Sequence, residues 1–220
     1  MNKDKHYKAP WLRSIVPCIL SVLVVALVIA LPGCTQKEAP SEPEIPAHFT
    51  TYTDEAGLFS ISYPPDWELA LSLIEDLEEF TKELITSIDS DLPLERTSTI
   101  FFAGLPTEMG YDPNVNIGVE SLPGFGWTLD KVVESGTRGI KDIAQEYHEY
   151  SRIKTTIGGR EAVIIDSEVY FPGLPKQHSL QMTTLVGKVA WYLTCSATLE
   201  KFSDFEDDFH AIVRSLRILK

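Results

Sequence analysis

The sequence has few cysteines and little positive charge, and each of these features excludes a class of protein. Its 220 residues include three cysteines, Cys18, Cys34 and Cys195, which excludes a framework of several disulfides. Lys and Arg number 19 against 32 Asp and Glu, and no basic stripe follows the first 33 residues. Because affinity for a phosphate backbone comes mostly from clustered cations, nucleic acid is not an expected partner.

Sequence signatures of common catalytic and cofactor sites are also missing. There is no Gly-x-Ser-x-Gly motif, no His-Glu-x-x-His motif and no glycine-rich nucleotide loop. The histidines stand far apart without the spacing of metal ligands, at His6, His48, His148, His178 and His210. We therefore assign no catalytic, cofactor-binding or metal-binding residue from the sequence, and we predict a protein that is not an enzyme.

The N-terminal segment has the pattern of an export signal. Lys3, Lys5, Lys8 and Arg13 precede an apolar run of 17 residues at 15–31. This run is at the short limit for crossing a hydrocarbon core about 30 Å thick, and a proline interrupts it, so an uncleaved transmembrane helix is the less favoured alternative. The following Leu-Pro-Gly-Cys sequence at 31–34 resembles a bacterial lipobox, although Pro32 stands where a small residue such as Ala or Ser is usual.

The lipobox resemblance implies that residues 1–33 are a signal peptide and that Cys34 becomes a lipidated N-terminus. Cys34 would carry a thioether-linked diacylglycerol, often with a further acyl chain such as palmitate on its amine, and two or more chains anchor a protein stably. The expected location is the extracytoplasmic face of the cell membrane. Residues 34–48 read as a Pro/Glu-rich linker, which reaches roughly 40 Å when extended at about 3.1 Å per residue.

Residues 49–220 are predicted to form a single acidic domain. Without the leader, the chain carries 15 Lys and Arg against 31 Asp and Glu, a net charge of −16. A chain of this length can bury about 70% of its extended surface in one core. Because Cys18 leaves with the leader and lipid would block Cys34, Cys195 has no disulfide partner, and the fold must be stable through its core alone.

Hydrophobic periodicity predicts an α+β fold with a single antiparallel β-sheet packed between α-helices. Strands are expected where apolar residues alternate or form short runs, at 59–63, 97–103, 115–122, 150–157, 162–171, 180–186 and 189–198. Helices are expected where apolar residues follow helical spacing, at 71–88, 129–147 and 205–216. The last of these would begin at a capping box from Ser203 to Glu206. Glycine and proline predict loops at 104–114 and 123–127.

Three segments in order resemble the PsbP-like superfamily, and the match covers about residues 50–219. A short hairpin leads into a strand that ends at Pro64-Pro65 near Trp67, a Gly158-Gly159 turn enters a strand, and a strand at 191–197 precedes the terminal helix. The family includes an extrinsic subunit of the photosynthetic oxygen-evolving complex, a nuclear-import factor that binds a small GTPase, and bacterial lipoproteins of unknown role. The resemblance implies a PsbP-like α/β/α sandwich with a role in binding or assembly, and it carries over no catalytic residue.

Two candidate reactive groups have simpler explanations. Ser151 and Lys154 fit the Ser-x-x-Lys pattern of penicillin-recognising enzymes, which needs a helix, whereas a strand places these side chains on opposite faces. A cell-envelope hydrolase is therefore an alternative function that rests on this motif alone. Cys195 is expected to be buried as a small apolar side chain. Asp166 and Glu168 are expected to share one strand face as solvated acids.

Two further groups are candidates for binding. Asp112, Asn114 and Asn116 offer oxygen ligands at alternating positions, and a cation-binding lipoprotein is a second alternative, although turn formation explains these residues better. Three aromatic residues in predicted loops, Tyr111, Phe125 and Trp127, form the predicted partner surface, because exposed aromatics often anchor interfaces. The predicted function is a lipid-anchored, extracytoplasmic, non-catalytic binding or assembly module with an unidentified protein or envelope partner.

Overall fold

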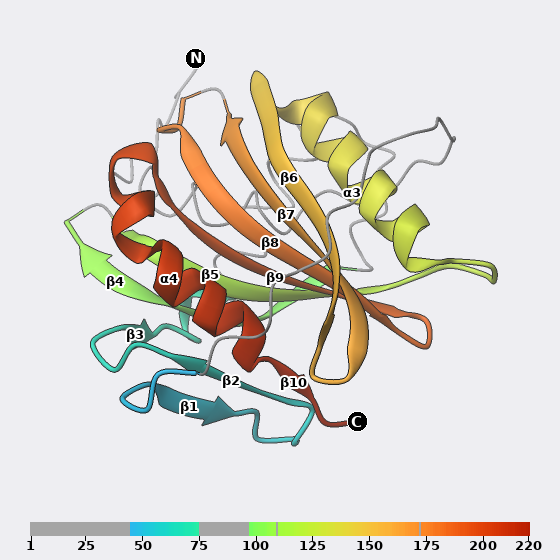
Figure 1. Ribbon diagram of the computed structural model, residues 1–220, viewed down its shortest axis with the longest axis horizontal. Helices are drawn as coiled ribbons and strands as arrows, with labels where there is room; N and C mark the ends of the chain where they lie inside the picture. The colour runs from blue at the N-terminus through green and yellow to red at the C-terminus, as the bar shows by residue number, and fades with distance from the viewer. Residues whose placement is uncertain (1–44, 75–96, 109, 172) are drawn as a thin grey trace, which may run out of the picture.

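Antiparallel strand pairing organises the part of the chain that the computed structural model describes, residues 45–74, 97–108, 110–171 and 173–220. Strands in these residues form two sheets (Figure 1). The small sheet has the order β1-β2-β10, with β1 (Thr50–Thr53), β2 (Phe59–Tyr63) and β10 (Arg217–Ile218). The large sheet has the order β3-β4-β5-β9-β8-β7-β6. Its strands are β3 (Glu68–Leu69), β4 (Thr97–Thr107), β5 (Gly110–Ser121), β6 (Glu146–Ile157), β7 (Arg160–Tyr170), β8 (Gln177–Val186) and β9 (Val189–Thr198).

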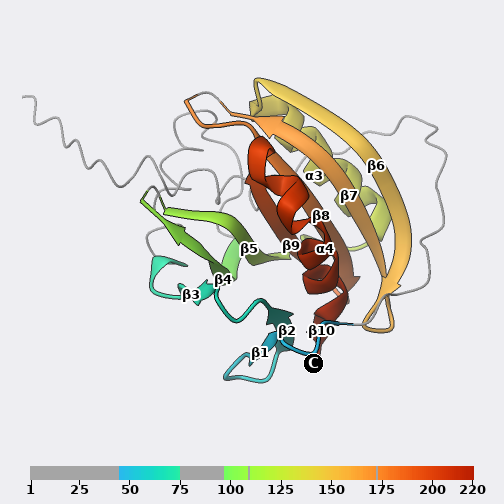
Figure 2. The ribbon, with the colours of Figure 1, turned by 60° about the vertical axis from the view of Figure 1, so that its left-hand side comes forward.

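Two helices of the described residues, α3 (Leu129–Ile143) and α4 (Leu199–Ser215), cover opposite faces of the large sheet (Figure 2). Successive residues of a strand point to opposite faces, and β7 shows both environments. Val163 packs in a cluster with Val133 of α3, whereas Ala162 belongs to the core beneath α4. Strands of the large sheet are therefore apolar on both faces, because each face is covered.

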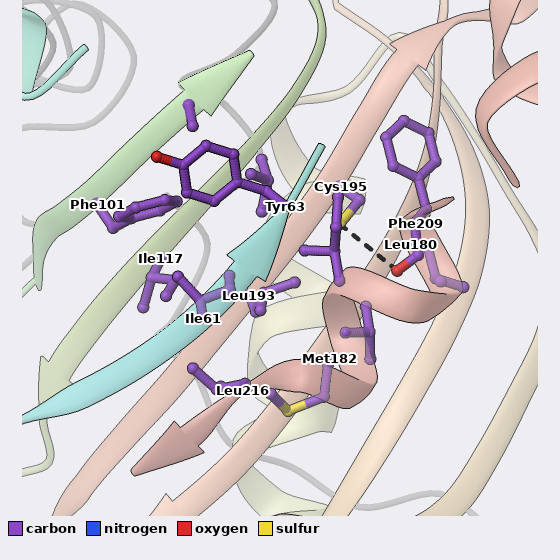
Figure 3. Close-up of a cluster of buried hydrophobic side chains, with 14 of the residues drawn as sticks. Ile61, Tyr63, Phe101, Ile117, Leu180, Met182, Leu193, Cys195, Phe209 and Leu216 are labelled. Atoms are coloured by element: carbon purple, nitrogen blue, oxygen red, sulfur yellow. Dashed lines mark hydrogen bonds between the residues drawn. The ribbon is translucent and has the colours of Figure 1, made fainter. Parts of the chain in front are cut away.

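The main core lies between α4, the small sheet and the large sheet. Phe59 of β2 is fully buried, with its ring centroid 6.1 Å from Phe101 of β4 and 6.0 Å from Trp191 of β9. Figure 3 shows Ile61 of the small sheet close to Leu193 of the large sheet. The alternating apolar residues at 59, 61 and 63 thus bury one edge of the domain, as the sequence pattern predicts.

The predicted fold class is wrong in placing every strand in a single sheet between helices. β2 pairs with β1 on one side and with β10 on the other. Neither of its hydrogen-bonding edges is left to pair with the large sheet. The described residues are mostly strand rather than evenly mixed. The sequence could not show this separation, because β10 has only two residues and lies more than 150 residues after β2 in the chain.

The predicted loop at 104–114 is also wrong, since these residues lie mostly in paired strands. β4 continues to Thr107 and β5 begins at Gly110, and Gly104 pairs with Asn114 across the hairpin. A Cβ atom on Gly104 would lie 2.7 Å from the carbonyl oxygen of Pro113, closer than real Cβ contacts. Glycine at this position therefore serves close strand packing rather than a turn.

Helix ends differ from the predicted ends because tertiary contacts decide them. The helix predicted at 129–147 ends at Ile143, and Gln145 already donates its N–H to the carbonyl of Tyr170 at 2.8 Å. The predicted capping box at Ser203 is wrong, because α4 begins at Leu199 with Thr198 as its N-cap. Residues 75–88 of the helix predicted at 71–88 lie outside the described residues.

Candidate binding surface

The loop between β5 and α3, residues 122–128, presents Phe125 to solvent. Gly124 and Gly126 on either side have φ of 67° and 87°, which are left-handed conformations that L side chains rarely adopt. Phe125 is 92% exposed. The two glycines turn the chain on both sides of this residue, so its ring stands away from the core.

Trp127 fixes the same loop to the domain. Its indole Nε1 donates to the carbonyl of Pro123 at 2.8 Å, and its ring packs against a cluster that includes Leu122 and Val132. Thr128 is the N-cap of α3 and accepts from the N–H of Lys131 at 3.3 Å. Trp127 therefore holds the loop, and Phe125 is the residue that the loop displays.

Two lysines contact the loop, and one of them contacts the exposed ring. Lys188, in the turn between β8 and β9, places its Nζ 3.8 Å from the centroid of the Phe125 ring, a cation–π contact. Lys131 donates from Nζ to the carbonyl of Gly126 at 2.9 Å. Lys154 pairs with Asp130 at 2.6 Å and neutralises this acid of the first turn of α3. Lys131 and Lys188 thus place two positive charges at the loop of a chain whose predicted mature form has a charge of −16.

Tyr111 lies elsewhere, at the other end of β5. Its ring is half-buried and packs edge-on against Phe102 at 5.5 Å. Burial raises the pKa of its phenol, and the charge of Glu68 acts in the same direction. At about 3.4 Å per residue, the length of β5 separates Tyr111 from the 122–128 loop by about 37 Å. The structure brings Phe125 and Trp127 together but not Tyr111, and Cys34 lies outside the described residues.

A second polar and aromatic group lies on the α4 face of the large sheet. We name it the histidine–acid cluster and define it as His148, Tyr150, Asp166, Glu168 and His178. His178 Nε2 lies 2.5 Å from Asp166 Oδ1, Tyr150 donates to Glu168, and the His148 and Tyr150 rings are 4.5 Å apart. The His178 ring also stacks on Phe202 of α4, with centroids 3.6 Å apart and planes 8° from parallel.

Sequence reasoning missed this cluster because three strands contribute to it. The shared face of Asp166 and Glu168 is confirmed, but their description as solvated acids is wrong, because both are half-buried and hydrogen-bonded to His178 or Tyr150. The two histidines stand 30 residues apart in the sequence, so their spacing does not indicate a cluster. Glu168 lies opposite His148 on one side and opposite His178 on the other, so pairing the predicted strands in register would have revealed the cluster. Within the described ranges, no group of three or more His, Cys, Asp and Glu side chains is arranged to hold a metal ion.

The two candidate reactive groups behave as strand geometry predicts. Lys154 lies opposite Val163 and reaches Asp130 of α3, whereas Ser151 lies opposite Asp166 on the α4 face. Cys195 is fully buried, its thiol 3.9 Å from the carbonyl of Phe209, and burial raises the pKa of that thiol well above its usual range. The placement of Ser151 and Lys154 on opposite faces is confirmed, as is the burial of Cys195.

Asp112, Asn114 and Asn116 lie within β5, so their explanation as turn formers is wrong. The Asp112 carboxylate accepts from the backbone N–H and the hydroxyl of Thr198, both at 3.0 Å, and pairs with Lys201 at 3.3 Å. Asn114 Oδ1 accepts from the Ser196 hydroxyl at 3.2 Å. Oxygens of Asp112 and Asn114 thus serve contacts within the domain, and Asp112 ties the start of α4 to β5.

Comparison with solved structures shows that the chain has the PsbP-like fold, which confirms the resemblance. Cyanobacterial PsbP (CyanoP) from Synechocystis matches with a TM-score of 0.52 at 13% identity, over 86% of this chain and 98% of that protein. LpqN of Mycobacterium tuberculosis, involved in cell envelope biogenesis, matches with a TM-score of 0.50 at 13% identity, over 79% and 92%. At such identity the likeness concerns the fold alone.

Comparisons of sequence give no further assignment. No protein-family model matches the chain, and no curated protein matches it. A membrane-crossing helix would need a long apolar stretch, and no helix in the described residues has one.

Proposed function

We propose that the protein is a lipid-anchored, extracytoplasmic, non-catalytic module that docks to a component of the cell envelope through the 122–128 loop. The observation that carries the proposal is Phe125, a large aromatic side chain 92% exposed on a loop that Trp127 fixes to the domain. The core does not need this ring. Its display suits recognition, because aromatic side chains are the commonest anchors of binding surfaces.

The way the loop is built supports a docking role. Association is weakened when a loop must become ordered on binding, and a loop held beforehand avoids part of that cost. Here the indole hydrogen bond to Pro123 and the Lys131 contact to Gly126 hold both ends of the loop. Phe125 can therefore be presented in a fixed position.

The sequence supports the anchor and the location. The leader and the Leu-Pro-Gly-Cys sequence place the expected acyl chains on Cys34, and the Pro/Glu-rich linker separates them from the domain. LpqN, which shares the fold, is described as involved in cell envelope biogenesis. A role in the envelope is consistent with both observations.

Photocrosslinking from the loop tests the proposal. p-Benzoylphenylalanine replaces Phe125 in one full-length form and Leu219, which is 52% exposed, in a control form. We expect the probe at 125, and not the probe at 219, to yield a defined protein or lipid adduct in cells. Equal labelling from both positions, or no adduct from 125 in the lipidated chain, would contradict the proposal.

A further inference from the structure

We infer that the 122–128 loop contacts the anionic headgroup layer of the membrane to which the chain is tethered. This inference rests on the lipid anchor of the proposed function, and it identifies anionic lipid as the binding partner of the loop. Its basis is the combination of one exposed aromatic ring with adjacent lysine charges on a rigid loop. Phe is among the side chains that membrane-surface segments bury at the boundary between headgroups and acyl chains, and lysines near an anionic surface add electrostatic attraction.

The lysine charges at the loop are available to anionic lipid. Lys188 Nζ lies over the Phe125 ring and Lys131 Nζ donates to a backbone carbonyl, and with the described residues neither ammonium forms an ion pair. Of the nearby acids, Asp130 is paired with Lys154, and the buried Glu120 accepts a hydrogen bond from the Tyr192 hydroxyl. An anionic surface would repel so acidic a domain as a whole, whereas these two lysines supply attraction at the loop, so we expect the loop to turn toward the lipid.

The shape of the loop favours a membrane over a protein partner. Gly124 and Gly126 flank Phe125, and Lys188 covers one side of its ring, so the loop offers a single apolar side chain bordered by glycine backbone and one cation. A stable protein interface buries about 800 Å² on each partner and uses about 20–30 residues a side. A headgroup layer needs no such complementary area, because a ring and a few cations suffice for a contact reinforced by a separate lipid anchor.

The tether allows this orientation. A domain of about 170 residues is about 40 Å across, which is roughly the reach of the extended linker. Any face of the domain can therefore turn toward the bilayer. Strand pairing places Ser121 opposite Val189, at the loop end, whereas Asn114 lies opposite Ser196 and Ser196 opposite Ser179, toward the other end. Contact through the loop would leave the histidine–acid cluster facing away from the membrane.

Site-directed spin labelling of the full-length lipidated chain tests the contact. A nitroxide, whose apolar five-membered ring stands in for the phenyl ring, is attached at Phe125→Cys or, as the control, at Ser203→Cys on the exposed side of α4. The buried Cys195 stays unlabelled. Each form is reconstituted in phosphatidylcholine vesicles with or without phosphatidylglycerol. We measure collisions of the nitroxide with oxygen, which concentrates in lipid, and with a neutral nickel chelate, which stays in water.

We expect the oxygen-to-nickel collision ratio at position 125 to rise several-fold in vesicles containing phosphatidylglycerol, while the ratio at 203 stays unchanged. A Lys131→Gln/Lys188→Gln double variant should lose this rise. Equal ratios at 125 and 203 in both vesicle types would overturn the inference. Shielding of position 125 that appears only after envelope proteins are added would also overturn it, since the occupant would then be a protein.

Flotation of the same samples separates the two proposals. If the chain floats with vesicles and a chain of residues 35–220, which lacks both the leader and Cys34, does not, the tether holds. A water-exposed nitroxide at 125 would then contradict only the loop contact. If both forms stay in solution, the tether itself fails.

Discussion

His210 of α4 illustrates how burial changes the chemistry of a single side chain. Burial and the nearby charge of Arg214 lower the pKa of its imidazole, and they outweigh the opposing charges of Glu206, Asp166 and Asp207. The folded protein therefore favours the neutral ring more than the unfolded chain does. This preference makes the stability of the domain depend on pH.

Replacement of His210 with Gln should reduce the acid sensitivity of the fold. A His with a lowered pKa contributes stability above the unfolded value of about 6.5, and the contribution is lost as pH falls through the folded pKa. Urea unfolding at about pH 7.5 and about pH 5 measures the difference. The exposed His48 provides the matched control, His48→Gln. The account is wrong on this point if the His210→Gln chain loses as much stability between the two pH values as the wild type does.

Gly158 and Gly159 form a matched pair for a second test at single residues. Both have positive φ, 57° and 78°, but a Cβ on Gly158 would lie 3.0 Å from the carbonyl oxygen of Leu216, whereas a Cβ on Gly159 meets open space. Alanine at either position should cost about 1–2 kcal/mol for the left-handed backbone. Gly158→Ala should cost more, because the turn after β6 also touches the chain before β10. Equal urea midpoints for the two variants would show that the contact with the Leu216 carbonyl does not affect the free energy of unfolding.

Among the elements, strands were easier to predict than element ends. Residues 59–63 alternate between apolar and polar side chains, and residues 189–198 are mostly buried on both faces of their strand. In both segments the side-chain pattern follows from which faces of the strand are covered, so the strands can be predicted from it. The start of α4 and the extension of β4 to Thr107 depend instead on distant partners, which periodicity does not contain. The loop with Phe125 could be predicted from its glycines and aromatic residues. The histidine–acid cluster could not be predicted without knowing which strand residues lie opposite each other.

Asp112 connects two elements and supplies the test at this scale. Its carboxylate binds the N-cap residue of α4, which is 86 residues away in sequence. Asp112→Asn removes the charge, and we expect a loss of about 1–3 kcal/mol in unfolding free energy, since hydrogen bonds to charged groups contribute about that much. Asp204→Asn, on the exposed side of α4, is the control. If urea unfolding gives both variants the wild-type midpoint, Asp112 does not hold α4 to β5.

On the scale of the whole molecule, the large sheet separates two kinds of surface. One end carries the 122–128 loop with Phe125 and its lysines, and the histidine–acid cluster lies toward the other end on the α4 face. The linker joins this domain to the expected acyl chains on Cys34. A tethered domain of this form would keep one end close to the bilayer and expose the other to the surrounding compartment.

The mass of the intact native protein tests the central proposal most directly. If the account is correct, mass spectrometry of the protein extracted from membranes will give a chain that begins at Cys34 and carries a diacylglycerol adduct, with or without a further acyl chain. A Cys34→Ala form should lack the adduct and retain its leader. A native protein that still begins at Met1 and carries no acyl group would contradict the account.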